Sequence, residues 1–273
     1  MEKSAMKIIN ETHSLSLKEN FAIERIHQST DQQLTDEKMT DMVIVEHHLD
    51  AYINDQLAFK LVCTPEKLDA LVLGFLLSEG YIEKPDEIEF IYVCESGERV
   101  KVQLNKPLAL PEIDHDTGSN SISCGNNRKI RQAAYAKSLI SIPVHDWSHE
   151  TVSMLANACN RNAGLFAETG GTHCCAMSIS GELTFICEDI GRHNAVDKAI
   201  GQALMEEKKL AEAILFTTGR IPSDMVIKAI RSGIPVIASH SAPTDEAVLL
   251  ARQFNLTLIG FVRGKRMNLY AGK

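Results

Sequence analysis

The second half of the chain predicts an α/β fold built on a parallel sheet. Short, continuous apolar runs alternate there with segments of helical periodicity. We expect strands at 214–217, 234–238 and 256–262, and helices at 223–231 and 245–254. Strands that are apolar along their whole length are covered on both faces, so this half should form a layered domain. In such sheets ligands bind where the strands end.

The first half predicts a smaller α+β unit. Residues 1–40 are polar and weakly periodic, which is typical of a tail with the first strands. A hairpin is expected over 51–62, because its central Asn-Asp pair suits a tight turn with positive backbone angles. Thr64 and Pro65 then carry the residue types that begin a helix, and Gly80 the type that ends one.

A second strand pair is expected at 88–94 and 99–104. Prolines and a polar run follow it and predict a linker. We therefore divide the chain into a tail with the first strands (1–40), a small α+β domain (41–115) and an α/β domain (116–273).

The start of the α/β domain adds further elements before the alternating pattern begins. The periodicity predicts helices at 128–137 and 149–161, the second with Ser148 as its cap and Gly164 as its stop. A third helix should run from a cap at Asn194 to Leu204, and strands are expected at 172–179 and 183–187. Thr244 should cap the helix at 245–254.

Composition excludes several classes of protein. The 273 residues are 44% hydrophobic and 23% charged, which is ordinary for a soluble globular protein. The net charge of −8 argues against a general nucleic-acid binder. No apolar run is long enough to span a bilayer, and the first residues lack the apolar core of a signal peptide. Seven cysteines without a disulfide framework suggest reduced thiols, so we expect a cytoplasmic protein.

One cysteine lies in a stretch of small and polar residues. Cys124 is followed by Gly125 and then by Arg128 and Lys129, ahead of a helical pattern. A helix N-terminus and the two cations would favour the thiolate, which is the reactive form of cysteine. The alternative is an idle loop cysteine, and the local sequence does not decide between the two.

Polar clusters follow the buried strands. In residues 188–198 carboxylates, an arginine and a histidine stand at a strand-to-helix junction, where backbone amides can bind an anion. The alternative is a solvated turn with a helix cap. The residues that we place in a possible pocket are His173, Asp189, Arg192, His193, Asn194, Ser241 and Thr244.

The C-terminal cluster joins an aromatic residue to three cations around a glycine. Arginine side chains match phosphate groups, an aromatic ring can stack on a base, and a glycine permits close approach of a ligand. The alternative is a basic edge strand whose charges deter aggregation. The candidate binding residues are Phe261, Val262, Arg263, Gly264, Lys265 and Arg266.

A metal site is not expected. Cys174 and Cys175 are adjacent in a strand and should point to opposite faces, so they cannot easily hold one ion. The spacing of a zinc deaminase is absent after His173. The remaining cysteines (Cys63, Cys94, Cys159 and Cys187) lie in apolar patterns and are expected in the core.

Together and in this order, the clusters resemble the FdhD/NarQ family of formate dehydrogenase accessory sulfurtransferases. The resemblance covers about 45–272 and is most specific in 170–173, 188–198, 241–244 and 261–268. It implies a cytidine-deaminase-like three-layer α/β domain beside a smaller α+β N-terminal domain, and a homodimer.

The resemblance also implies a function. Family members take persulfide sulfur from a cysteine desulfurase and pass it to the Mo-bis(molybdopterin guanine dinucleotide) cofactor of formate dehydrogenase. Cys124 matches the persulfide cysteine, which is the first of a CxxC pair, and Asn127 replaces the second. This excludes a disulfide within the motif but leaves sulfur transfer possible. The guanine-dinucleotide site of the family falls on 261–266.

Two other classes of function stay open. The first is a chaperone that binds the molybdenum cofactor without moving sulfur, and the second is a deaminase-like hydrolase, which would require zinc. Full formate dehydrogenase activity with Cys124→Ala would favour the first, and a stoichiometric zinc content the second.

Overall fold

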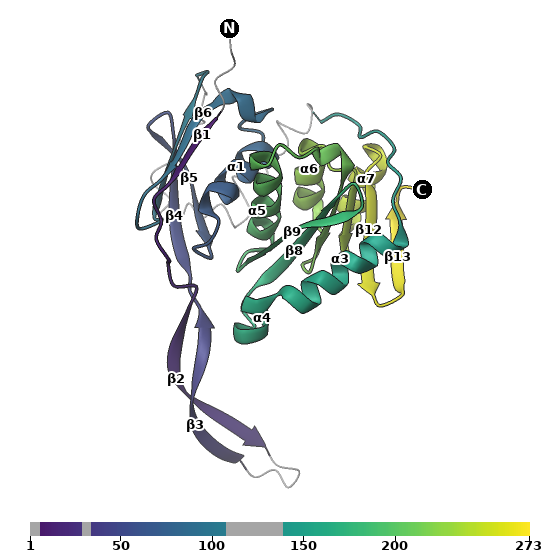
Figure 1. The fold of residues 1–273 in the computed structure, drawn as a ribbon. Coiled ribbons are helices and arrows are strands. Elements are labelled where there is room, and N and C mark those ends of the chain that lie inside the picture. The colour runs from purple at the N-terminus through teal and green to yellow at the C-terminus, as the bar shows by residue number, and fades with distance from the viewer. Residues whose placement is uncertain (1–5, 29–33, 108–138) are drawn as a thin grey trace.

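The computed structural model describes residues 6–28, 34–107 and 139–273, and it shows two lobes and a protruding arm (Figure 1). The lobes are stacked as alternating layers of sheet and helix. Cys124, the helix expected at 128–137 and the boundary expected between residues 115 and 116 lie outside the described residues.

The N-terminal lobe is a five-stranded sheet in the order β1-β6-β7-β4-β5. Its expected hairpin is confirmed, and Asn54 and Asp55 have positive φ angles of 49° and 62°. The second strand pair is also confirmed. The strands are β1 (Lys7–Asn10), β4 (His47–Ile53), β5 (Gln56–Cys63), β6 (Ile88–Val93) and β7 (Arg99–Leu104).

Helix α1 (Leu68–Ser78) covers this sheet, but its expected start was wrong. Thr64 does not cap the helix, which begins four residues later after Lys67, a residue in the left-handed conformation with no side-chain cap. The reason is that the Thr64 hydroxyl is bound elsewhere, to a buried aspartate and a buried lysine of the other lobe.

The C-terminal lobe is a six-stranded sheet in the order β13-β12-β11-β10-β8-β9. The three central strands are parallel, as expected, but the sheet is mixed because β13 and the β8–β9 hairpin run antiparallel to their neighbours. The strands are β8 (His173–Ile179), β9 (Glu182–Asp189), β10 (Ala213–Thr217), β11 (Val236–Ser239), β12 (Thr257–Arg263) and β13 (Arg266–Ala271).

Helices cover both faces of this sheet. One face packs on α3 (His149–Asn162), through residues such as Leu155 and Phe216. The other face packs on α5 (Arg192–Met205), α6 (Ser223–Arg231) and α7 (Asp245–Gln253). Ser148 caps α3 and Thr244 caps α7, as expected.

Three short elements complete the lobes. Gly164 does not simply end α3, because it begins the short helix α4 (Gly164–Thr169). Two 3₁₀ turns lie at Pro85–Glu87 and Leu210–Glu212. Among the described helices, none combines the length and apolar character needed to cross a membrane.

The two lobes meet through α1 and α5. Gly74 and Gly201 lie where the helix backbones touch, since a Cβ atom on either glycine would overlap backbone of the other helix. Beside this contact, Ser78 of α1 donates a hydrogen bond to Asp197 (2.6 Å) and accepts one from Lys228 (2.8 Å), all three being buried. One hydrophobic core therefore runs through both lobes.

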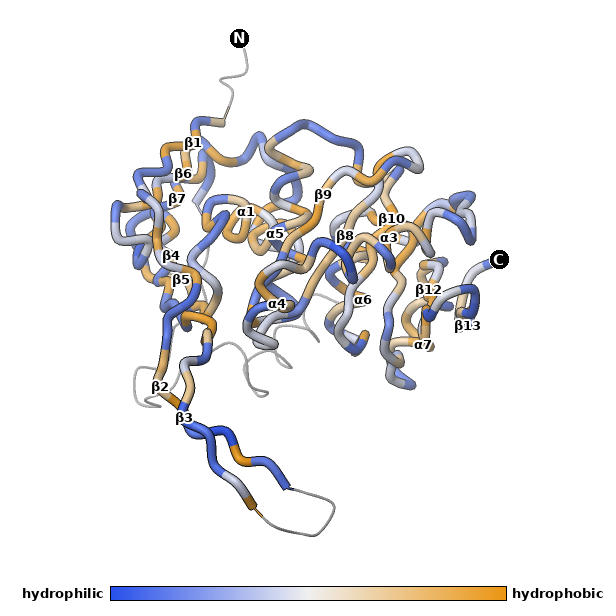
Figure 2. Tube along the Cα trace, turned by 60° about the horizontal axis from the view of Figure 1, so that its bottom comes forward, coloured by the Kyte–Doolittle hydropathy of each residue, from blue (hydrophilic) through white to orange (hydrophobic). Residues whose placement is uncertain are grey.

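The arm is an antiparallel ribbon of β2 (Lys18–Gln28) and β3 (Leu34–Ile44) that leaves the body of the molecule (Figures 1 and 2). Strands were expected in this region, but not two of 11 residues each. Its polar and apolar residues are interleaved along both strands (Figure 2).

Candidate functional site

The candidate site lies along the edge of the six-stranded sheet where β10, β11 and β12 end. Because β8 runs antiparallel to β10, its first residues lie at this same edge, and so does the end of β9. His173 at the start of β8 therefore comes next to Thr218 after β10, with 3.3 Å between Nδ1 and Oγ1. Polar groups from the start of β8 and from the residues after β10 therefore meet at this edge.

Arg192 and His193 face this edge from the first turn of α5. The aliphatic part of Arg192 packs on Gly219, where an added Cβ would lie 2.7 Å from Arg192 Cδ. His193 Nε2 lies 3.2 Å from the Asp224 carboxylate on α6. Burial lowers the pKa of His173, and the nearby Arg192 and His193 lower it further. The junction thus places a guanidinium and two imidazoles close together.

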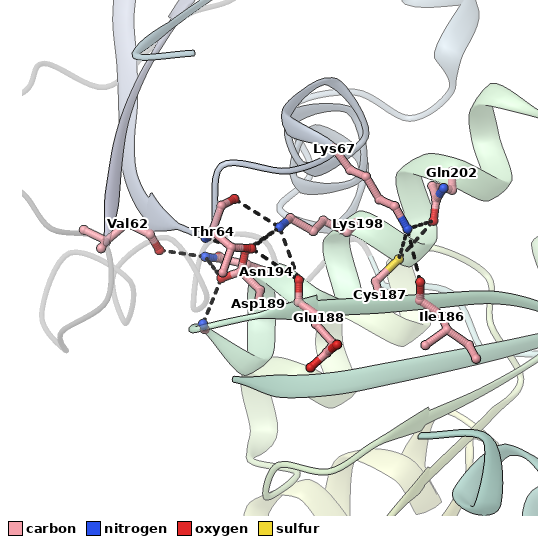
Figure 3. Close-up of polar contacts among 11 residues, drawn as sticks. Val62, Thr64, Lys67, Ile186, Cys187, Glu188, Asp189, Asn194, Lys198 and Gln202 are labelled. Atoms are coloured by element: carbon pink, nitrogen blue, oxygen red, sulfur yellow. Dashed lines mark hydrogen bonds and ion pairs between the residues drawn. The ribbon is translucent and has the colours of Figure 1, made fainter. Parts of the chain in front are cut away.

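Asp189 is the buried anchor of this junction (Figure 3). One carboxylate oxygen accepts hydrogen bonds from Gly191 N (2.8 Å) and Asn194 Nδ2 (2.9 Å). The other accepts from the backbone N and hydroxyl of Thr64 (3.1 Å each) and pairs with Lys198 (2.7 Å). Asp189 is fully buried, and these contacts of its carboxylate fix the backbone that carries Arg192 and His193.

Asn194 was expected to cap α5, and this was wrong. The helix begins at Arg192 with Gly191 before it. The Asn194 amide instead donates to Asp189 and to the Val62 carbonyl of the other lobe (2.8 Å). Its side chain therefore ties the junction to the end of β5 (Figure 3).

The outer edge of β9 is closed by lysines. Lys67 donates to the Ile186 carbonyl (3.1 Å) and Lys198 to the Glu188 carbonyl (3.3 Å). Ammonium groups therefore take the place that a neighbouring strand would have on this edge. Lys67 also lies 3.3 Å from Gln202 Oε1, which accepts a hydrogen bond from the Cys187 thiol (Figure 3).

Ser241 and Thr244 have different surroundings. The Ser241 backbone accepts from Phe261 N (3.1 Å), and its hydroxyl donates weakly to the Thr218 carbonyl (3.4 Å), so it connects two strand ends. Thr244 uses its hydroxyl as the cap of α7 through Ala247 N. The structure thus brings Ser241 to the edge and gives Thr244 a capping role.

The basic C-terminal segment forms the turn between β12 and β13. Phe261 has a positive φ of 52° at an irregularity in the ladder, and Gly264 one of 58° in the turn. Val262 is buried, whereas the three cations of this turn (Arg263, Lys265 and Arg266) are exposed. Like charges placed directly opposite destabilise a strand pair, and Arg263 is paired with Arg266. An anion bound between them would relieve this repulsion.

The turn and the α5 junction lie at the same edge but apart. Three strand spacings separate β12 from β8, or about 14 Å. None of the three cations of the turn forms an ion pair within the described parts of the chain. The edge can therefore hold an elongated anionic ligand that contacts both groups.

Five of the six described cysteines are buried. Burial raises the pKa of Cys63 to about 12 and that of Cys187 to about 11, so these thiols stay protonated near neutral pH. Cys94 was expected in the core, but it is only partly buried. Burial raises the pKa of Cys94, yet a hydrogen bond with Ser96 and bonds from nearby backbone amides outweigh this and leave it below its ordinary value.

Cys174 and Cys175 point to opposite faces of the sheet, as expected, and belong to different cores. In the described ranges, no three His, Cys, Asp or Glu side chains are grouped so that they could hold a metal ion.

The sequence reasoning missed Thr64 as part of the site, and it gave Lys198 no role of its own within the cluster 188–198. Thr64 was assigned to a helix cap. Lys198 lies among inward-facing positions of α5, next to Asp197, and both are fully buried. A lysine and an aspartate in an otherwise apolar helix pattern were the available signal that each has a buried partner of opposite charge, which is Asp189 for Lys198 and Lys228 for Asp197.

Comparisons with known proteins show what this chain is similar to. A protein from Listeria monocytogenes serotype 4b (strain F2365), named "Sulfur carrier protein FdhD", is 34% identical over 241 residues, which cover 87% of this chain and 92% of that protein. Proteins of the same name from Bacillus subtilis (strain 168) and Sulfurisphaera tokodaii are 35% and 38% identical, covering 85% and 77% of this chain and 89% and 80% of theirs.

The fold also matches a solved structure. A crystal structure from Desulfotalea psychrophila, of a protein described as a candidate formate dehydrogenase accessory protein, has a TM-score of 0.74 with this chain at 26% identity. The match covers 93% of this chain and 97% of the other. The family model described as "FdhD/NarQ family" matches residues 44–273, which include both the α5 junction and the basic turn. The chain therefore belongs to the FdhD/NarQ family.

Proposed function

We propose that this chain is a sulfurtransferase that serves formate dehydrogenase. It takes persulfide sulfur from a cysteine desulfurase onto Cys124 and passes it to the Mo-bis(molybdopterin guanine dinucleotide) cofactor, which it binds as a substrate. The observation that carries the proposal is family membership across residues 44–273, with relatives named as sulfur carriers. We further propose that the protein acts in the cytoplasm as a homodimer.

The chemistry requires one nucleophilic thiol. The Cys124 thiolate attacks the outer sulfur of the donor's persulfide, the donor's S–S bond breaks, and the donor cysteine leaves as a thiolate. Cys124 then carries the transferred sulfur as its own persulfide, with no net oxidation. Cys63, Cys175 and Cys187 are poor substitutes because burial disfavours their thiolates.

The sheet edge supports binding of the cofactor. A guanine dinucleotide carries phosphates along an extended chain, and the edge offers cations at two places, the turn and the α5 junction. Arg263, Lys265 and Arg266 are exposed and free to contact phosphates, and Phe261 lies beside them. On a chain with a net charge of −8, this local group of cations supplies the attraction for an anion.

Mass spectrometry tests the sulfur step. The protein is incubated with a cysteine desulfurase and cysteine, and the peptides are mapped without reduction. We expect one added sulfur atom on Cys124, retained in Cys94→Ala and lost in Cys124→Ala. Cells with the Cys124→Ala variant should lose formate dehydrogenase activity. Full activity would instead indicate a chaperone that binds the cofactor without moving sulfur.

Guanosine diphosphate tests the binding step separately. The double variant Arg263→Ala with Arg266→Ala should bind it about 10–100-fold more weakly, because two charge-assisted contacts are lost. Lys208→Ala with Lys209→Ala is the matched control, since it removes two charges just before β10, at the opposite edge of the sheet. Equal affinity of both double variants would refute the nucleotide site.

A further inference from the structure

Strand β12 carries one extra residue just before the basic turn. Between Gly260 and Arg263 the strand advances by three residues, whereas its partner β13 advances by two. Such a bulge bends a strand and redirects the side chains that follow it. On the other side of β12, the pairing with β11 ends at Ile259. The stretch that aims the turn therefore lies outside both regular ladders.

This stretch also holds a conformation that costs energy. Phe261 has a φ of 52°, in the left-handed region that residues with a Cβ atom disfavour. A residue keeps such a conformation only where its surroundings fix it. Arg263 and Arg266 stand opposite each other at the end of the bulge, and their like charges also favour a different arrangement. Contacts from outside the β12–β13 hairpin are therefore needed to hold the turn in place.

The residues that follow β11 supply these contacts. The Ser241 carbonyl accepts a hydrogen bond from Phe261 N (3.1 Å). His240 reaches the next residue, with 2.6 Å between its Nδ1 and the Val262 carbonyl oxygen. A carbonyl oxygen only accepts, so His240 Nδ1 carries the proton and donates. Both residues of the bulge are thus held, one through its N–H and the other through its carbonyl.

The His240 ring is itself held in one orientation. It stands edge-on to Phe216 of β10, with 5.1 Å between the ring centroids and 85° between the ring planes. Its second nitrogen, Nε2, lies 3.0 Å from the side-chain oxygen of Asn160 on α3. The Ser239 hydroxyl fixes the backbone on either side of the ring, since it accepts from Ser241 N (2.8 Å). The imidazole therefore connects α3 and β10 to the bulge of β12.

We propose that His240 is a positioning residue for the basic turn, acting through the Val262 carbonyl while Asn160 orients its ring; this role rests on the nucleotide site proposed above. The peptide group is planar, so a fixed Val262 carbonyl oxygen also fixes the N–H of Arg263 and the direction in which the turn leaves the strand. A turn that already has its binding arrangement loses less entropy when it takes up an anion. His240 thus raises the affinity of the turn without contacting the ligand.

The alternative is that His240 only satisfies a buried carbonyl and so contributes to stability alone. Val262 is fully buried, and a buried carbonyl oxygen needs a partner. Two substitutions separate the interpretations. The amide nitrogen of asparagine is as many bonds from Cα as Nδ1 of histidine, so His240→Asn keeps a donor for Val262. The amide nitrogen of glutamine matches Nε2, so His240→Gln places its donor toward Asn160 instead.

The first measurement is an NMR comparison of the ligand-free proteins. The backbone amide signals of residues 263–266 are recorded for wild type, His240→Asn and His240→Gln. We expect these signals to move in His240→Gln and to stay close to their wild-type positions in His240→Asn. Both variants lose the ring that packs on Phe216, so both should melt at similarly lowered temperatures. Signals that stay in place in His240→Gln, or that move equally in both variants, would overturn the positioning role.

Calorimetry with guanosine diphosphate measures the consequence for binding. His240→Gln should bind it about 10-fold more weakly, whereas His240→Asn and Asn160→Ala should stay within about threefold of wild type, because both keep the bond to Val262. Asn162→Ala is the matched control. It removes an asparagine of the same helix, whose amide donates to the Ala158 carbonyl (3.1 Å), and it should bind as tightly as wild type.

The outcomes distinguish the positioning role from the nucleotide site itself. If His240→Gln binds as tightly as the control while Arg263→Ala with Arg266→Ala binds weakly, the nucleotide site stands and the positioning role is wrong. If wild type does not bind guanosine diphosphate, the nucleotide site is wrong, and so is the role of His240 in binding. Weaker binding by His240→Gln, with binding by His240→Asn preserved, would support both.

Discussion

Removal of one buried hydroxyl should disturb the candidate site from the other lobe. Thr64 lies in the N-terminal lobe, yet its hydroxyl stands between Asp189 and Lys198, donating to the first (3.1 Å) and accepting from the second (2.6 Å). Thr64→Val keeps the shape of the side chain and deletes both bonds. The junction carrying Arg192 and His193 then loses part of its support.

The cost to folding follows from the contacts that remain. A hydrogen bond to a charged group contributes about 1.5–3 kcal/mol. Asp189 keeps three other N–H donors and its ion pair, and Lys198 keeps two carbonyl acceptors, so neither charge is left alone. We therefore expect a loss of about 2 kcal/mol in the free energy of unfolding. For a chain of this size, that lowers the melting temperature by about 4–8 °C.

A matched control separates geometry from stability. Ser78 of α1 holds the same position in the second buried network, where it donates to Asp197 and accepts from Lys228. Its partner Asp197 lies farther along α5 from the junction. Ser78→Ala should lower the melting temperature by a similar amount without changing the sheet edge.

Two assays report on the edge itself. In the ligand-free protein, the pKa of His173, measured by NMR titration, should rise toward its ordinary value in Thr64→Val and stay unchanged in Ser78→Ala, because burial and the nearby Arg192 and His193 now hold it down. Guanosine diphosphate should bind more weakly to Thr64→Val alone. If Thr64→Val loses stability but keeps the wild-type pKa of His173 and the wild-type affinity, lobe docking does not set the geometry of the edge.

Three further changes test separate parts of the structure. Gly219→Ala should displace Arg192 and weaken binding of guanosine diphosphate in calorimetry, whereas Gly164→Ala, where nothing lies near the new methyl group, should not; equal affinities would show that Arg192 does not contact the nucleotide. His173 has a lowered pKa in the folded state, so the unfolded chain binds more protons below about pH 6.5 and stability falls as the pH drops through that value. Urea unfolding at about pH 7.5 and about pH 5.5 should show a smaller fall in His173→Gln, and an unchanged fall would contradict this assignment. Cys94 should react with iodoacetamide faster than the five buried cysteines, because it is partly exposed and has a lowered pKa; peptide mapping that finds Cys94 as slow as Cys175 would contradict it.

Elements with strong local signals were predicted well from the sequence. The helix at 223–231 was placed at its observed bounds, and the caps Ser148 and Thr244 act as expected. These features depend on side chains within a few residues of each other. A cap is decided by a hydroxyl and a backbone N–H three positions later, so the sequence around it contains nearly all the information.

Features that depend on distant partners were not predictable in this way. Thr64 has the residue type of a helix cap, but Asp189, 125 positions away, competes for the same hydroxyl with a buried charge. Asn194 also fails as a cap, and its amide donates both to Asp189 and to the carbonyl of Val62, 132 positions away. Strands were expected in the arm, but their length was missed because both faces of the arm are exposed, so its strands lack the apolar alternation that marks a half-buried strand.

Two groups of charges in this chain should respond differently to salt. Asp189 with Lys198, and Asp197 with Lys228, are buried and little screened, so they hold the lobes and the α5 junction in place at any ordinary ionic strength. Arg263, Lys265 and Arg266 are exposed, so their attraction for an anion is screened. It follows that the two ways of weakening nucleotide binding are distinguishable. Loss of the exposed arginines should reduce the salt dependence of the affinity, whereas Thr64→Val should lower the affinity and leave that dependence intact.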